Sequence, residues 1–165
     1  MVVFDELKAT FWKAGASEAH ALTDDKLDQA ERILRVKLPE VLVDLLRIRD
    51  GGTVAANWNA FPTSQPTSWS DTHVPFDELM GIREAASGSL LDTPYLTDEW
   101  SLPTPIVLLS GDGHTWIALD YRKGTGSMEP SVTWFDTDSD TELHLASTFR
   151  SFVEHLVSAS SIVGD

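Results

Sequence analysis

A chain of 165 residues without cysteine is long enough to bury a hydrophobic core and can use neither disulfides nor thiolate-bound metals. Its formal net charge of −14 is uneven, with 10 acidic and 8 basic residues up to Gly52 and 16 acidic and 4 basic residues from Thr53 onward. This balance argues against nucleic acid and anionic membrane surfaces as partners, because both are bound through Lys and Arg. A basic protein is the natural complement, although negative charge also serves solubility on its own.

The N-terminal residues bear on location. Asp5 and Glu6 lie where a secretory signal peptide carries basic residues, and no stretch approaches the roughly 18 apolar residues of a membrane span. We therefore expect a soluble, cytoplasmic protein. The length predicts one domain, residues 1–165.

Three helices are predicted in the first third of the chain. The first has an apolar face at helical spacing and ends near Gly15. Thr23 is a suitable N-cap for the second helix, and Pro39 is a suitable first-turn residue for the third. The predicted buried faces are Phe4, Leu7, Phe11 and Trp12 in the first helix, Leu27, Ala30, Ile33 and Leu34 in the second, and Leu42, Leu45 and Leu46 in the third, which Gly51 and Gly52 close.

The middle of the chain loses this periodicity. Residues 53–75 are rich in Thr, Ser, Asn and Pro, yet they include Trp58 and Trp69, which a disordered linker would lack. We expect a long loop or strand-and-loop segment that its tryptophans hold on the body. A short helix is predicted at 76–88 and a further loop at 96–105.

The last third predicts strands followed by one helix. Ser147 is the predicted N-cap of that helix, whose apolar residues recur at helical spacing. The predicted strands are 105–110, 115–121 and 131–136, and the apolar residues of the helix are Phe149, Phe152, Val153 and Leu156. This order predicts an α+β domain with a mainly antiparallel twisted sheet, against which the N-terminal helices and the C-terminal helix pack.

The stretch LLSGDGHTWIALDYR, residues 108–122, contains an arrangement that suggests catalysis or metal binding. Asp112-Gly113 between two strand-like runs favours a β-hairpin turn, with His114 as its solvated flank. Asp120 follows at a distance of up to ~17 Å along a strand, so the two carboxylates could share an ion only across a sharp bend. A hydrolase that uses Asp112, His114 and Asp120 remains a third hypothesis for function.

The stretch DTDSDTE begins like a calcium loop but departs from the pattern. Its sixth position is Thr141 instead of glycine, and its twelfth is Ser147 instead of glutamate. We predict a solvated acidic turn that contacts a basic partner through Asp136, Asp138, Asp140 and Glu142. The five histidines show no ligand spacing, so no catalytic residue, cofactor or metal is predicted.

The tryptophans divide by their surroundings. Trp116 and Trp134 lie in strand-like runs and are predicted core residues. Trp58 and Trp69 either hold their loop on the body or anchor an interface, where tryptophan is the most enriched residue type. Together with Asp71 and the acidic turn, they make up the predicted partner-binding residues.

Three segments in order resemble the SUKH superfamily, which includes bacterial immunity proteins and fungal cell-wall-synthesis regulators. They are the two-helix stretch 21–52, the hairpin 108–122, and the stretch 130–156 with its terminal Ser-x-Phe-x-x-Phe helix. Arg35 and Val36 stand where family members typically show a small residue or glycine. The resemblance covers about two thirds of the chain and leaves the middle segment unaligned.

The resemblance implies a binding module and no enzymatic activity. Many members of the superfamily are cytoplasmic antidotes to polymorphic toxins, often nucleases, that are delivered between neighbouring bacterial cells. It therefore implies an immunity protein that covers the basic surface of a cognate toxin, with an intracellular scaffold or regulator as the alternative. The sequence leaves the oligomeric state open.

Overall fold

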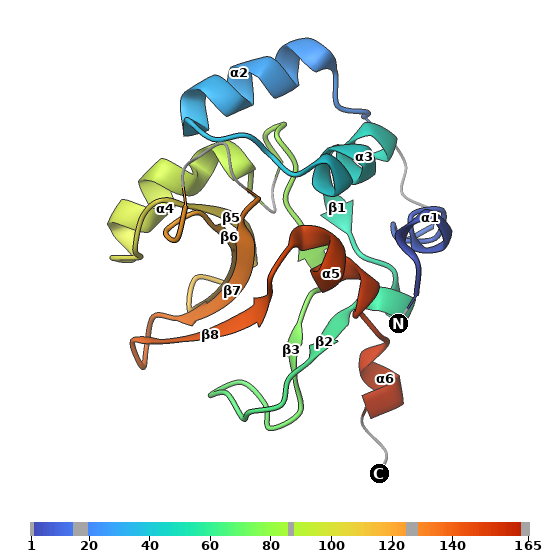
Figure 1. The fold of residues 1–165 in the computed structure, drawn as a ribbon, viewed down its shortest axis with the longest axis vertical. Helices are drawn as coiled ribbons and strands as arrows, with labels where there is room; N and C mark the ends of the chain where they lie inside the picture. The colour runs from blue at the N-terminus through green and yellow to red at the C-terminus, as the bar shows by residue number, and fades with distance from the viewer. Residues whose placement is uncertain (1, 15–19, 86–87, 125–128, 163–165) are drawn as a thin grey trace.

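The computed structural model describes residues 2–14, 20–85, 88–124 and 129–162 and has an α+β fold (Figure 1). Its helices are α1 Phe4–Leu7, α2 Asp24–Leu34, α3 Glu40–Ile48, η1 Ala56–Trp58, η2 Leu90–Asp92, α4 Thr93–Glu99, α5 Phe149–Glu154 and α6 Ala159–Ile162. Its strands are β1 Gly52–Thr53, β2 Ala60–Pro62, β3 His73–Pro75, β4 Glu78–Leu79, β5 Ile106–Gly111, β6 Thr115–Asp120, β7 Ser131–Asp136 and β8 Thr141–Ala146. The predicted fold class is confirmed.

The main sheet has four antiparallel strands in the order β5-β6-β7-β8. The three predicted strands are confirmed as β5, β6 and β7, whereas β8 was not predicted. Glu142 and His144 alternate in β8 with Leu143 and Leu145, and its outer position in the sheet leaves half of its residues exposed. An edge strand of this kind differs little from a polar turn by composition, which explains why the sequence did not reveal it.

Both faces of this sheet are covered. In β6 and β7 every residue after the first is buried, and the core residues of the described chain form one hydrophobic cluster. Helix α5 contacts β7, β8, α1 and α3, while α4 contacts β5 (Figure 1). The predicted core positions Trp116 and Trp134 belong to this cluster. The turns that join these strands therefore extend from a sheet that is packed on both faces.

The predicted helices α2 and α3 are confirmed, with one change in the buried face. Thr23 Oγ1 accepts the N–H of Lys26 at 3.4 Å, so it caps α2 as predicted. Ala30 is buried on this helix as predicted. Ile33 was predicted to be buried as well, but it is 55% exposed and lies outside the core. At the other end of the chain, Thr148 and not Ser147 caps α5.

The first helix is shorter than predicted. Helix α1 ends at Leu7, and Trp12 instead forms a β-bridge with Val54 and donates its indole N–H to the Leu45 carbonyl at 3.0 Å. Phe11 is buried as predicted. The predicted C-cap Gly15 lies outside the described residues.

Arg35 ends α2 in the left-handed region, with φ 59° and ψ 34°. Glycine accepts this conformation freely, whereas a side chain costs about 1–2 kcal/mol there, a cost that the higher unfolded-state entropy of glycine partly offsets. We expect Arg35→Gly to raise the free energy of unfolding by about 0.5–1 kcal/mol in urea denaturation. Arg32→Gly, inside the same helix, should lower it by about 1 kcal/mol. If Arg35→Gly is no more stable than the wild-type protein, the left-handed conformation of Arg35 does not cost stability as we expect.

Residues 53–75 contain the 3-10 helix η1 and the short strands β2 and β3, joined by loops. Two short antiparallel pairs, β1–β4 and β2–β3, lie within or beside this range. The short helix predicted at 76–88 is wrong for the described part of that range, which contains β4 and the bridge of Gly81 with Ser89. The loop predicted at 96–105 is wrong in its first part, which belongs to α4.

Asp50 organises this segment. It is 1% exposed, and its carboxylate accepts the N–H groups of Ile82 at 2.7 Å and Arg83 at 3.1 Å. The Asp50 carbonyl accepts Arg83 Nε–H at 2.9 Å. A Cβ on Gly81 would lie 2.3 Å from the Asp50 backbone, so the chain approaches Asp50 as closely as only glycine permits. These bonds replace the helical pattern that the local sequence favours.

Candidate functional site

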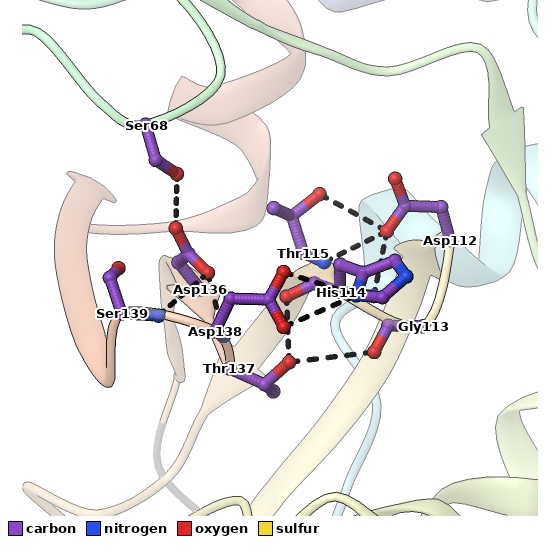
Figure 2. A network of polar contacts seen from close by, with 9 residues as sticks. All are labelled: Ser68, Asp112, Gly113, His114, Thr115, Asp136, Thr137, Asp138 and Ser139. Carbon is purple, nitrogen blue, oxygen red and sulfur yellow. Dashed lines mark hydrogen bonds and ion pairs between the residues drawn. The ribbon is translucent and has the colours of Figure 1, made fainter.

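Two turns of the main sheet lie side by side (Figure 2). One turn joins β5 to β6, and the other joins β7 to β8. Thr137 connects them, because both its N–H and its hydroxyl donate to the His114 carbonyl, at 2.8 and 2.9 Å. We call the exposed side chains of the two turns the tip cluster: Asp112, His114, Asp138 and Asp140.

Asp112 holds the first turn together. Its Oδ1 accepts the N–H groups of His114 and Thr115, both at 2.8 Å, and Gly113 takes a positive φ of 97°. Partial desolvation acts to raise the pKa of Asp112, but the N–H donors of Thr115 and His114 outweigh it and leave that pKa below its usual value. The predicted hairpin turn is therefore confirmed, with Asp112 ionised at neutral pH.

Asp120 lies at the opposite end of β6 from this turn. Its carboxylate accepts two bonds from Arg122, at 2.9 and 2.8 Å, and one from the Thr133 hydroxyl at 2.9 Å. Burial acts to raise the pKa of Asp120, and the hydrogen bonds from Arg122 outweigh it and lower that pKa. The structure thus does not bring Asp120 together with Asp112 and His114, and within the described residues no group of three potential ligands could hold a metal ion.

Asp136 shapes the second turn from inside. It is 4% exposed and accepts the N–H groups of Asp138 at 2.9 Å and Ser139 at 3.3 Å, together with the Ser68 hydroxyl. The hydrogen bond from Ser68, the largest contribution, lowers the pKa of Asp136. The prediction of a fully solvated acidic turn is wrong at this position, because Asp136 has almost no surface to offer a partner. Asp138 and Asp140 are exposed, as predicted.

The Ser68 hydroxyl also fixes a second segment beside the tip cluster (Figure 2). We call residues 63–72, between β2 and β3, the Trp69 loop. Trp69 is 46% exposed and makes an edge contact with the buried His73 ring at 5.0 Å between centroids. Asp71 is exposed in the same loop. The structure therefore gathers Trp69 and the acidic turn from segments that are far apart in the sequence.

Two of the predicted partner-binding residues have other surroundings. Trp58 is half-buried against the core, and its indole N–H donates to Thr10 Oγ1 at 3.2 Å, so it holds its segment on the body. Glu142 lies in β8 and pairs with Arg122 at 2.6 Å. That guanidinium also stacks over Phe135 at 5.3 Å. Neither Trp58 nor Glu142 belongs to the tip cluster.

His114 is the titratable cation of the tip cluster. Its Nδ1 lies 3.2 Å from Asp138, and the hydrogen bond to this carboxylate raises the pKa of His114. We expect NMR titration to give a pKa above about 6.5, and the pKa should fall towards that value in Asp138→Asn. Because protonation adds a positive charge, the tip cluster becomes less negative as the pH falls through this pKa. Equal His114 pKa values in the two proteins would show that the pair does not form in solution.

Sequence reasoning missed Ser68, which bonds to Asp136. It also missed the two acids Asp77 and Glu78, which line one pocket together with Trp69. The predicted helix at 76–88 hid the acids, because it placed their side chains on a helix surface. Ser68 gave no signal, since a serine in a polar loop has no pattern. Its partner Asp136 is 68 positions away in the sequence.

Comparison with known proteins extends the resemblance seen in the sequence. The family model of the SMI1 / KNR4 family (SUKH-1) matches residues 21–155, from just before α2 to the end of α5. This range includes the middle segment that the sequence motifs left unaligned. No curated protein matches the chain. Within the described residues, no helix has the length and apolar character needed to cross a lipid bilayer. The chain belongs to the SMI1 / KNR4 family (SUKH-1).

Proposed function

We propose that this protein is an immunity protein that binds a cognate polymorphic toxin and neutralises it by covering its surface. Membership of the SMI1 / KNR4 family supports an immunity or regulatory module that binds other proteins. The observation that carries the proposal is the tip cluster beside the Trp69 loop, where exposed carboxylates and an exposed tryptophan share one end of a packed sheet. Tryptophan anchors surrounded by polar residues are typical of protein interfaces.

Electrostatics indicate the kind of toxin. A nuclease binds phosphate through basic side chains, and this protein is acidic enough to attract such a surface and occlude it. A specific interface would bury about 1,200–2,000 Å² in total. The inhibition is steric and electrostatic, with no chemical step. We place it in the cytoplasm, with no nucleic acid or membrane as a direct partner.

The contact residues in this proposal differ slightly from those predicted by the sequence. Trp69, Asp71, Asp138 and Asp140 remain, because all four are exposed. Asp136 positions the turn from inside, and Glu142 lies in β8, where it forms an ion pair with Arg122. Trp58 is left out, because its indole is used within the protein.

The alternative is an intracellular scaffold or regulator with several partners, which the same family membership allows. The two functions differ in gene context and in phenotype. An immunity protein is encoded beside a toxin gene, and its loss sensitises the cell to that toxin.

Co-expression with the product of the neighbouring large gene tests the proposal. We expect the two proteins to co-purify and the cells to survive a toxin that otherwise kills them. A variant with Asp71, Asp138 and Asp140 changed to Asn should protect less at equal abundance. Toxicity unchanged by the wild-type protein, with no complex on size exclusion, would overturn the immunity function and favour the scaffold.

A further inference from the structure

A pocket of about 270 Å³ lies beside the tip cluster, between the β5–β6 hairpin and the chain that runs from the Trp69 loop into β4. Its wall includes an exposed indole, three carboxylates and one buried indole. These residues are Trp69, Asp77, Glu78, Asp112 and Trp116. The pocket therefore joins the Trp69 loop to the first turn of the tip cluster.

The pocket is negative and has no internal counter-ion. No lysine, arginine or histidine is among its lining residues, and within the described chain none forms an ion pair with Asp77, Glu78 or Asp112. The partner of Glu78 is the Thr53 hydroxyl at 2.9 Å, and that of Asp77 is the Asn59 amide at 3.5 Å. Neutral donors leave the charges of these carboxylates uncompensated.

Two indoles complete the pocket. Trp69, nearly half exposed, can stack on a cation, and tryptophan is the best aromatic residue for that contact. Trp116 is buried, and its Nε1–H has no acceptor in the part of the chain that the structure describes. A buried donor without an acceptor is uncommon and costs about 1–3 kcal/mol. Because this N–H is enclosed by the protein, the Trp116 ring contributes wall area and no donor to the pocket.

We infer that this pocket receives one arginine side chain of the partner protein. The inference rests on the proposed function and specifies which group of the partner is bound. A guanidinium is planar, stacks on indole and donates to more than one carboxylate, so it matches the pocket better than the compact ammonium of lysine.

NMR titration with N-acetyl-arginine amide tests the pocket without the toxin. The probe carries the guanidinium without free terminal charges, and N-acetyl-citrulline amide is its neutral control. We expect the indole N–H signals of Trp69 and Trp116 to shift with saturation for the arginine probe and not for citrulline. The Trp58 signal should not move.

Variants make the assignment specific. Trp69→Ala and the pair Asp77→Asn/Glu78→Gln should each weaken the probe at least fivefold, with unchanged melting temperatures. The pair Asp25→Asn/Asp28→Asn removes the same charge from α2, which lines no part of this pocket, and should leave the probe's affinity unchanged. Equal binding of citrulline, or a loss in the α2 control equal to that in the pocket variant, overturns the inference. Tighter binding of free arginine than of the amide also overturns it, because the site would then take a small molecule.

The two proposals can fail separately. If the probe binds as expected but the neighbouring gene product is neither bound nor neutralised, the pocket stands and the immunity function falls. If the toxin is neutralised equally well by the wild-type protein and by both pocket variants, the function stands and the arginine site falls.

Discussion

Replacing Asp50 with alanine should lower the free energy of unfolding by about 2–4 kcal/mol. The change leaves two main-chain N–H groups, those of Ile82 and Arg83, without their acceptor, and the first lies in the interior. A buried N–H that loses a charged acceptor costs about 1–3 kcal/mol, and water can reach the N–H of Arg83 more easily. Urea denaturation followed by circular dichroism measures the loss.

Two further variants separate the hydrogen bonds from the charge. Asp50→Asn keeps one acceptor oxygen and should cost about half as much as alanine. Asp44→Ala, at an exposed position of α3, should change stability by less than about 0.5 kcal/mol. A cost below about 1 kcal/mol for Asp50→Ala would mean that the segment after β4 is not held by this carboxylate. The pocket depends on this carboxylate, because Asp50 fixes the segment that follows β4, and β4 contributes Glu78 to the pocket.

Changing Asp71, Asp138 and Asp140 together to asparagine should slow association with the cognate toxin about tenfold at low salt. The three side chains are exposed, so their charges steer encounter with a basic surface and contribute little to folding. Asparagine also suits position 140, where φ is 53°. Stopped-flow measurement of the association rate, with melting temperatures as the check on folding, gives the result.

A charge-matched control shows whether the position of the charges matters. Changing Glu6, Asp25 and Asp28 to Gln, Asn and Asn removes the same three charges from α1 and α2. We expect this control to slow association far less than the triple variant. Equal slowing would assign the effect to net charge, and a large drop in melting temperature of the triple variant would assign those acids to the fold.

The helices α2 and α3 could be predicted because their signals are local. Thr23, Pro39 and the leucines of each buried face lie within one or two turns of one another. The strands β5 to β7 were predictable for the same reason, as continuous or alternating apolar runs. Strand β8 was not, because its two leucines alternate with Glu142 and His144 and it follows a polar turn directly.

The failures have a common physical cause, which is contact between distant segments. The helix predicted at 76–88 yields to hydrogen bonds from Asp50, and the burial of Asp136 comes from Ser68 and the turn that it caps. Neither partner could be identified from one sequence. The predicted set of partner-binding residues therefore mixed exposed acids, such as Asp138, with a buried one.

The salt dependence of association tests the central claim most directly, namely that this protein binds a basic macromolecule through its acidic surface. We expect the rate of association with the toxin encoded by the neighbouring gene to fall at least tenfold between about 0.05 and 0.5 M NaCl. Exposed charges are screened beyond ~10 Å at 0.1 M, which explains the decrease. The dissociation rate should change much less. An association rate that is the same at both salt concentrations would contradict the account.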